Sequence, residues 1–290
     1  MKTQYFTTTA SGTSYSLHYK IWGESNLKTL VCVHGLTGNS DDFKFIGEKF
    51  FAEGFRVVAL DMAGRGLSSY YSNPDDYNFD QYIYDLNLLL KEIGCDTPSS
   101  CDWLGVSMGG LLGFRLSGIP NSPIKRLILS DIGPEVPQFD LDFISKIIKL
   151  IPEYNHPSDA IPILKMSTCT PYSRGPLDED QWLYLASSAL KQREDGKYIR
   201  NFDANIASKF DTEPLGKQDL WGYWEKTAQP ALSLRGELST LFPVRVADAM
   251  RTRKPNDNFT MVTVAGAGHV PSLFRDDQIK IISDWLTSTP

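Results

Sequence analysis

The chain has 290 residues, of which 41% are hydrophobic and 12% are aromatic. This composition supports one large core, or a core with an accessory lobe, and it excludes disordered, collagen-like and disulfide-stapled chains. The formal charge is −6 and no long basic run offsets it. We therefore expect a small molecule as the partner, and neither nucleic acid nor an anionic membrane.

Short apolar runs alternate with helix-like segments along the chain, which predicts a mostly parallel sheet flanked by helices. Residues 4–10 and 13–22 alternate polar and apolar side chains and predict an antiparallel pair at the edge of the sheet. Strands of the buried type follow at about 28–33, 56–60, 101–105, 125–130, 230–234 and 259–264. The prediction is an α/β fold with an eight-stranded sheet.

Helical segments fill the gaps between these strands. Asn78 and Gln81 resemble a capping box that opens a helix, and Gly94 ends it. Residues 278–286 predict a terminal helix on the sheet. Residues 135–225 show helical periodicity and no convincing buried strand. We interpret them as a helical cap inserted after the sixth strand, with residues 1–134 and 226–290 forming the core.

Two groups of apolar side chains stand out in the predicted cap. One is an amphipathic stripe and the other an aromatic concentration: Phe139, Phe143, Ile144, Ile147, Ile148 and Ile151 in the first, and Trp182, Tyr184, Trp221, Tyr223 and Trp224 in the second. Such groups usually pack an insert against itself and against the main sheet. The alternative is that they wall an apolar pocket.

The termini and the cysteines bear on location. The opening MKTQYFTTT lacks the apolar region of a signal peptide, and no stretch approaches 18 uninterrupted apolar residues. The cysteines show no CxxC spacing; they are Cys32, Cys95, Cys101 and Cys169. Buried thiols in a reducing compartment are the expectation, so we predict an unprocessed, cytoplasmic protein that does not associate with membranes.

The motif with the most chemical content is Gly105-Val106-Ser107-Met108-Gly109, which follows a predicted strand and opens a predicted helix. A G-x-S-x-G turn of this kind is sharp and strained, and it lifts the serine hydroxyl above the carboxyl edge of the sheet. Gly105 and Gly109 are needed because a Cβ at either position would collide with the neighbouring strand or helix.

Two other segments could supply the groups that a nucleophilic serine requires. His34-Gly35-Leu36 follows a buried strand, where a loop can offer a main-chain N–H to an oxyanion. Gly268-His269 follows the last predicted strand and brings an imidazole to the same sheet edge. A serine hydroxyl is a poor nucleophile unless such an imidazole accepts its proton.

With these motifs and with Asp61-Met62-Ala63-Gly64-Arg65-Gly66 after the fourth strand, the chain resembles the α/β-hydrolase superfamily of serine hydrolases, with the insert where that family carries its cap. The resemblance implies that Ser107 is the nucleophile and His269 the general base. It also implies oxyanion donation by the N–H groups of Leu36 and Met108. His34 is usually structural in this family, and Asp61 is interpreted as holding the turn after its strand.

The third member of the triad departs from the family pattern. Close-looking relatives carry an aspartate where this chain has Thr240, in Arg235-Gly236-Glu237-Leu238-Ser239-Thr240. Asp131, at the end of the strand next to the nucleophile's strand, is the preferred substitute. Glu237 is an alternative, although it comes early in its loop and would face solvent or pair with Arg235. A triad without a functional acid is the third alternative.

The committed prediction is a cofactor-free serine hydrolase acting on a small, largely apolar ester or related acyl compound. No zinc-ligand spacing, Walker motif or dinucleotide fingerprint is present. One alternative is a carbon–carbon bond hydrolase, whose carboxylate substrate would want cap-face arginines such as Arg115 or Arg174. The other is a ligand-sensing protein with a weakened triad, which only Thr240 favours.

Overall fold

The computed structural model describes residues 1–150, 152–166, 176–207 and 220–290. Its central feature is an eight-stranded sheet in the order β1-β2-β4-β3-β5-β6-β9-β10. The strands are β1 (Lys2–Ala10), β2 (Thr13–Trp22), β3 (Lys28–Val33), β4 (Phe55–Leu60), β5 (Cys101–Val106), β6 (Ile124–Ser130), β9 (Ala231–Gly236) and β10 (Phe259–Val264). β1 pairs antiparallel with β2 and β2 with β4, and the other pairings are parallel. The predicted fold is confirmed.

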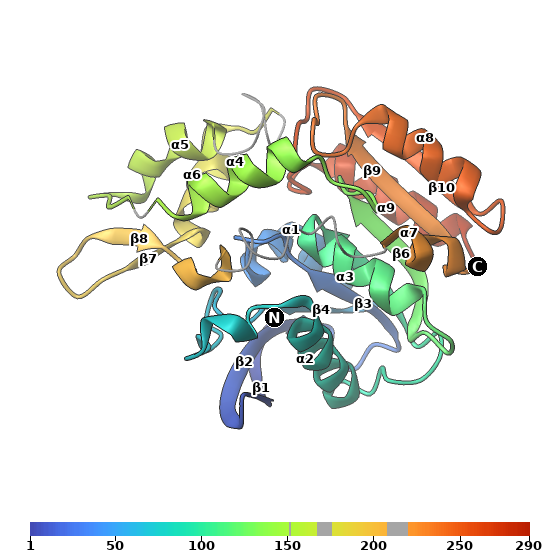
Figure 1. The fold of residues 1–290 in the computed structure, drawn as a ribbon, viewed down its shortest axis with the longest axis horizontal. Helices are drawn as coiled ribbons and strands as arrows, with labels where there is room; N and C mark the ends of the chain where they lie inside the picture. The colour runs from blue at the N-terminus through green and yellow to red at the C-terminus, as the bar shows by residue number, and fades with distance from the viewer. Residues whose placement is uncertain (151, 167–175, 208–219) are drawn as a thin grey trace.

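Helices cover both faces of the sheet (Figure 1). One face packs against α1 (Lys44–Ala52) and α9 (Asp276–Ser288), and the other against α2 (Phe79–Glu92), α3 (Met108–Ser117), α7 (Leu220–Lys226) and α8 (Val244–Arg253). The strands divide their side chains between the two layers, since Leu30 and Cys32 face the first and Val31 and Val33 the second. Both layers are apolar, which is why β3 reads as a continuous hydrophobic run.

The caps and short helices follow local signals. The Asn78 side chain accepts a hydrogen bond from Gln81 N and begins α2, and Gly94 takes a φ of +68° just beyond its end. Short 3₁₀ helices occur at η1 (Ser40–Phe43), η2 (Pro74–Asp76), η3 (Pro157–Ala160) and η4 (Ala204–Ala207). Of these, η1 follows the loop after β3 and lies beyond the carboxyl end of that strand.

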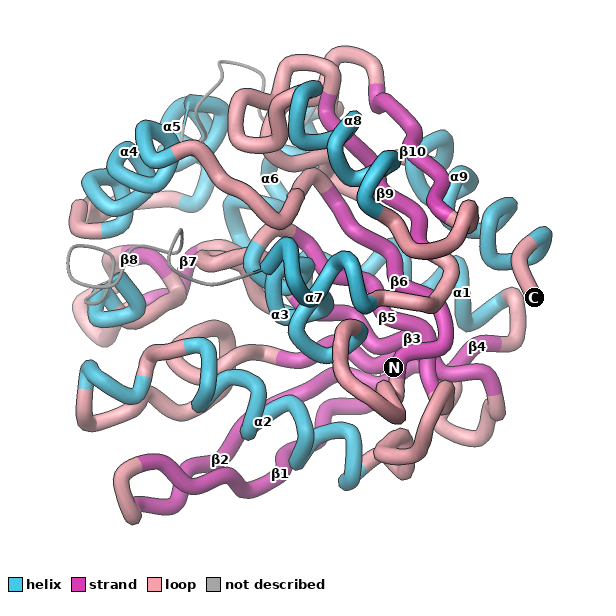
Figure 2. Tube along the Cα trace, turned by 45° about the vertical axis from the view of Figure 1, so that its right-hand side comes forward, coloured by secondary structure: helices cyan, strands magenta, loops and turns pink. Residues whose placement is uncertain are grey.

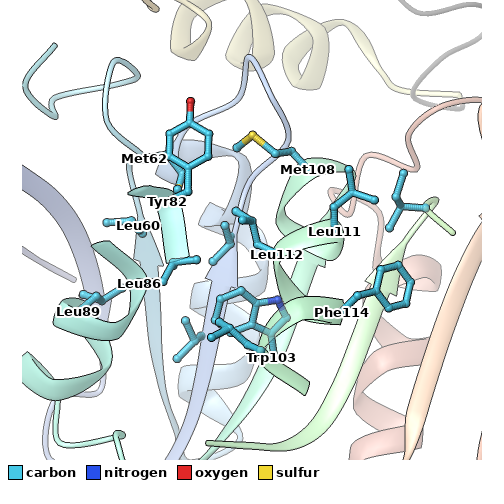
Figure 3. Close-up of a cluster of buried hydrophobic side chains, with 14 of the residues drawn as sticks. Leu60, Met62, Tyr82, Leu86, Leu89, Trp103, Met108, Leu111, Leu112 and Phe114 are labelled. Atoms are coloured by element: carbon cyan, nitrogen blue, oxygen red, sulfur yellow. The ribbon is translucent and has the colours of Figure 1, made fainter. Parts of the chain in front are cut away.

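A cluster of buried side chains fixes α3 on the sheet (Figure 3). Trp103 of β5 is fully buried, and its indole Nε1–H donates to Gly109 O over 3.1 Å. Leu112 and Phe114 of α3 pack in the same cluster. Burying each such side chain contributes about 1.5–3 kcal/mol. The helix that follows Ser107 is therefore held rigidly against the strand that precedes it.

The insert after β6 carries α4 (Gln138–Ile148), α5 (Ile161–Met166) and α6 (Glu179–Ser188). It also carries a short hairpin of β7 (Leu190–Gln192) and β8 (Tyr198–Arg200), which the predicted helical cap did not include. In both ribbon views these elements lie together at one end of the sheet (Figures 1 and 2). Three-residue strands with half-exposed side chains bury too little apolar surface to stand out in the sequence.

The apolar groups of the insert divide between several roles. Phe139 is 78% exposed, against the expectation of packing, whereas Ile148 is buried. Ile151 lies outside the described residues. Trp224 is fully buried at 0% exposure, and its ring meets Phe114 at 5.7 Å and Phe259 at 5.0 Å. Helix α7 therefore packs with the core layer and not with α4–α6.

Candidate active site

Ser107 stands in the turn between β5 and α3, with a φ of +49°. The turn is possible because two glycines bring the chain unusually close to its neighbours. A Cβ on Gly105 would lie 2.4 Å from Gly109 O, and one on Gly109 would lie 2.0 Å from Val33 O. Both distances are far below a van der Waals contact, so the steric reason predicted for these glycines holds.

Three predicted site residues lie in hydrogen-bond contact. His269 Nε2 is 3.0 Å from Ser107 Oγ, and His269 Nδ1 is 2.8 Å from Asp131 Oδ2. Asp131 is fully buried at the carboxyl end of β6, and its φ of +52° turns its side chain toward the imidazole. His269 comes from the loop after β10. The nucleophile candidate and the acid candidate thus come from adjacent parallel strands.

The Glu237 carboxylate lies elsewhere. Its Oε2 accepts a hydrogen bond from Gly266 N over 2.9 Å, and the residue is exposed. The pairing with Arg235 that the sequence offered as one possibility does not involve the carboxylate, because Arg235 Nη1 donates to the main-chain oxygen of Glu237. Glu237 therefore helps to close the loop before His269 and makes no contact with the imidazole.

Ser239 is a residue of the site that sequence analysis missed. Its Oγ–H donates to Asp131 Oδ2 over 2.5 Å, and Gly236 N donates to Asp131 Oδ1 over 2.7 Å. These two donors and His269 together supply hydrogen bonds to both oxygens of the buried carboxylate. Thr240, at the position where relatives carry the acid, instead donates to Asp140 Oδ1 at the start of α4.

The loop after β3 passes directly beside the nucleophile. A Cβ built on Gly35 would be 3.4 Å from Ser107 Cβ, so the chain at Leu36 lies close to the hydroxyl. In the part of the chain that the structure describes, the N–H groups of Leu36 and Met108 donate to no protein acceptor. Their role as oxyanion donors stays a prediction.

Arg65 supports this loop from beneath. It is fully buried, its Nε donates to Leu36 O over 2.9 Å, and its Nη1 donates to Ala63 O and to Tyr82 Oη. A buried guanidinium is stable only when its donors are satisfied. These contacts join the stretch after β4 to the loop after β3.

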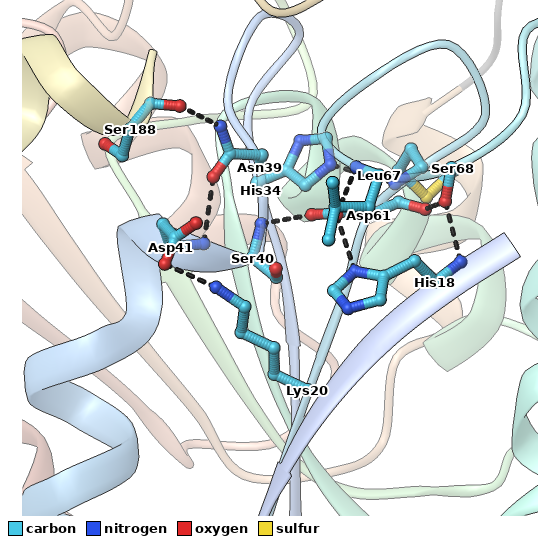
Figure 4. A network of polar contacts seen from close by, with 11 residues as sticks. His18, Lys20, His34, Asn39, Ser40, Asp41, Asp61, Leu67, Ser68 and Ser188 are labelled. Atoms are coloured by element: carbon cyan, nitrogen blue, oxygen red, sulfur yellow. Dashed lines mark hydrogen bonds and ion pairs between the residues drawn. The ribbon is translucent and has the colours of Figure 1, made fainter. Parts of the chain in front are cut away.

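A polar network fixes the other side of the same loop (Figure 4). Asp61 accepts hydrogen bonds from Ser40 N, Leu67 N and the ring of His18. Burial alone would raise the pKa of Asp61, but these donors hold it below its usual value. Burial lowers the pKa of His34 to about 4, and its neutral Nε2 accepts from Met62 N. His34 and Asp61 therefore act on the shape of the loop and not on the reacting atoms.

A cavity of about 150 Å³ lies between the insert and the sheet edge. Ser107 and His269 form part of its wall. Its remaining wall is largely apolar and comes mostly from the insert, with Ile144, Ile147, Ile148, Ile163, Leu164, Leu185, Leu190 and Phe202 among the lining residues. Part of the predicted apolar stripe therefore faces a pocket. Arg200 also lines it.

Of the two arginines that the sequence suggested for a carboxylate substrate, Arg115 is not among the residues that line this cavity. Arg115 pairs with Asp80 at the surface, and Arg174 lies outside the described residues. Among the described residues there is no group of three His, Cys, Asp or Glu side chains that could hold a metal ion. None of the helices in the described ranges combines the length and the hydropathy that crossing a bilayer requires.

Comparisons with known proteins agree with this architecture. A family model described as the alpha/beta hydrolase fold matches residues 28–276. The chain is 29% identical to 3-hydroxybutyrate-oligomer hydrolase of Cupriavidus necator over 94% of this chain and 93% of that protein. It is 25% identical to proline iminopeptidase of Clostridium botulinum over 94% of each. The structure of an alpha/beta hydrolase from Novosphingobium aromaticivorans matches with a TM-score of 0.87 and 28% identity, covering 99% of this chain and 98% of that one.

Proposed function

The chain belongs to the alpha/beta hydrolase fold family, and from this premise we propose that it is a serine hydrolase cleaving a small, largely apolar ester or related acyl compound through an acyl-enzyme. One observation carries the proposal. Ser107, His269 and Asp131 form a continuous chain of hydrogen bonds at the wall of an apolar cavity. The family and the hydrolase relatives support hydrolytic chemistry.

The proposed first step is attack of Ser107 Oγ on the substrate carbonyl carbon. His269 Nε2, 3.0 Å away, takes the hydroxyl proton as the new C–O bond forms. Asp131 accepts from Nδ1–H over 2.8 Å, which fixes the tautomer that leaves Nε2 free to accept and stabilises the imidazolium. The imidazolium then protonates the leaving alcohol as the carbonyl re-forms. Water attacks the acyl-enzyme by the same proton route, releases the acid and restores Ser107.

Charge on the carbonyl oxygen is the second requirement of this chemistry. The N–H groups of Leu36 and Met108 are proposed to donate to that oxygen. Met108 is the first residue of α3, so the positive end of the helix dipole adds to its N–H. Arg65, which donates to Leu36 O, adds positive charge behind the same loop. These donors are held before substrate arrives and need no rearrangement during the reaction.

The cavity and the relatives indicate the substrate class. A volume of about 150 Å³ and an aliphatic wall suit a short acyl or alkyl group. The Cupriavidus relative is named for hydrolysis of 3-hydroxybutyrate oligomers. Oligomers of a hydroxy acid are joined by ester bonds, which agrees with the ester proposed for this chain.

Two further expectations stand as proposals. The ligand-sensing alternative rested on the missing acid at Thr240, and the contact of Asp131 with His269 weighs against it. A cytoplasmic location is proposed because Cys32, Cys95 and Cys101 are free and buried. Cys169 lies outside the described residues.

The test is labelling by a serine-directed fluorophosphonate together with turnover of p-nitrophenyl esters of increasing chain length. We expect the wild-type protein to be labelled and to prefer short acyl chains. Ser107→Ala should abolish labelling and lower turnover by about 10³-fold or more, because the nucleophile is lost. Ser187→Ala, on the exposed side of α6, is the matched control and should change neither. Retained labelling or turnover in pure Ser107→Ala would overturn the proposal.

A further inference from the structure

Arg200 lines the cavity that contains Ser107, and the mechanism above does not use it. It is the last residue of β8, and it pairs with Leu190 of β7 on the hairpin of the insert. Leu190 lines the same cavity. The hairpin that sequence analysis missed therefore brings a cation into a wall that is otherwise largely aliphatic.

The guanidinium of Arg200 is only partly engaged by the protein. Its Nη1 donates to Ile147 O over 3.0 Å, and its central carbon lies 5.6 Å from the ring centroid of Phe202. Burial lowers the pKa of the group, which shows that its charge is partly desolvated. In the described ranges no carboxylate forms an ion pair with it, whereas Arg193 on the same hairpin pairs with Glu153 and Asp195.

Such an arrangement is costly for the folded protein unless an anion arrives. A guanidinium carries five N–H donors in a planar fork that fits two carboxylate oxygens. Removing it partly from water without a counter-ion disfavours the charged form. A substrate carboxylate would satisfy the remaining donors inside a pocket where hydrogen bonds to charge are strong.

We propose that Arg200 binds a carboxylate of the substrate, so that the ester cleaved at Ser107 is a short monoanionic one. This inference rests on the proposed function, because it assigns the substrate of the same cavity. A single guanidinium among aliphatic side chains suits one carboxylate better than a phosphate, which collects several cationic or N–H donors.

The acidic residue of the cavity gives the substrate a direction. Asp42 lines the pocket beside Gly38, at the loop that carries Leu36, and has its own interactions within the protein. Its charge repels a carboxylate from the loop side, while Arg200 attracts it to the insert side. The carboxylate is thereby kept away from the developing oxyanion, with the ester bond between the two.

The test uses a matched pair of substrates, 3-(butyryloxy)butanoate and the neutral 3-(butyryloxy)butanamide. Arg200→Gln should lower kcat/KM for the carboxylate roughly 10- to 100-fold, mainly through KM, because one charge-assisted contact is lost. It should lower kcat/KM for the amide by no more than about threefold. Arg200→Lys keeps the positive charge but not the planar fork of donors. Its kcat/KM for the carboxylate should therefore lie between those of the wild-type protein and Arg200→Gln. Arg193→Gln, on the same hairpin, removes the same charge outside the cavity and should not change the preference.

A binding measurement decides the inference independently of turnover. In the Ser107→Ala protein, calorimetry with butanoate should detect binding that Arg200→Gln weakens by about tenfold or more. The role of Arg200 would be overturned if butanoate bound Ser107→Ala with and without Arg200→Gln equally well. It would also be overturned if Arg200→Gln lowered kcat/KM equally for 3-(butyryloxy)butanoate and 3-(butyryloxy)butanamide. Either result would leave the proposed function intact. If neither ester is turned over and Ser107 is not labelled by the fluorophosphonate, the proposed function fails, and the butanoate result still decides whether Arg200 binds a carboxylate.

Discussion

Replacing Asp131 by asparagine tests the least conventional part of the proposed site. Asp131 Oδ2 accepts from both Ser239 and His269, and Oδ1 accepts from Gly236 N. An asparagine can keep one oxygen toward Gly236 but must then turn its NH₂ toward the imidazole. The imidazole would become an acceptor at Nδ1 and carry its proton on Nε2, so it could no longer take the proton of Ser107.

The expected loss follows from that reversed tautomer. Turnover should fall by about 10³- to 10⁴-fold, with KM little changed, because the lost interaction strengthens only when the imidazolium forms. The side chain keeps its volume, and Ser239 can rotate its hydroxyl to accept from the new NH₂. We therefore expect the variant to fold, and circular dichroism with a urea titration checks this.

The assay is steady-state hydrolysis of a short p-nitrophenyl ester by wild-type protein, Asp131→Asn and Glu237→Gln. Glu237→Gln is the matched control, because it makes the same chemical change at a carboxylate that contacts Gly266 and not His269. Glu237→Gln should lower turnover by less than about tenfold. If Glu237→Gln proves the more damaging change, the assignment of the acid is wrong. Small, equal effects would mean that the histidine needs no acid.

Two further predictions concern stability. Gly109→Ala should lower the free energy of unfolding by about 3 kcal/mol, since the added methyl would lie 2.0 Å from Val33 O. Gly54→Ala is the control, because its added methyl meets nothing within 4 Å; it should lower the free energy of unfolding by only about 1–2 kcal/mol, owing to the positive φ. Equal losses for the two variants in urea titrations would contradict the steric argument. Because the pKa of His34 is lowered to about 4 in the folded protein, its contribution to stability is complete above about pH 6.5 and is lost as the pH falls toward 4. Between pH 7 and pH 5 the free energy of unfolding should fall by about 2 kcal/mol for this reason, and His34→Gln should lack this fall. If the free energy of unfolding of His34→Gln depends on pH as strongly as that of the wild-type protein, His34 is not the group responsible.

The strands of the sheet were predictable because β1 and β2 alternate polar and apolar residues and the other strands are short apolar runs. The predicted 13–22, 28–33 and 259–264 match β2, β3 and β10, and the others differ at their ends by a residue or two. The turn at Ser107 was predictable for a related reason, since only glycines on both sides permit it. In both cases the decisive physics is local and leaves its mark on neighbouring residues.

The parts that could not be predicted depend on contacts between distant residues. Ser239 is an ordinary loop serine until the fold brings it to Asp131, 108 positions away in the chain. Arg200 has no signal of its own, because its direction follows from the pairing of β7 with β8. The hydrogen bond from Thr240 to Asp140 was likewise unpredictable, because the packing of the insert brings the two residues together.

The position of Asp131 directly after β6 affects when the proposed site can form during synthesis. Ser107 and Asp131 both precede the insert, on neighbouring strands that pair directly with each other. His269 follows the insert and lies 138 positions after Asp131 in the chain. A nascent chain that has passed the insert holds Ser107 and Asp131 but lacks His269, which contacts both of them. The ribosome must therefore synthesise the insert, β9 and β10 before the chain of hydrogen bonds from Ser107 to Asp131 can close.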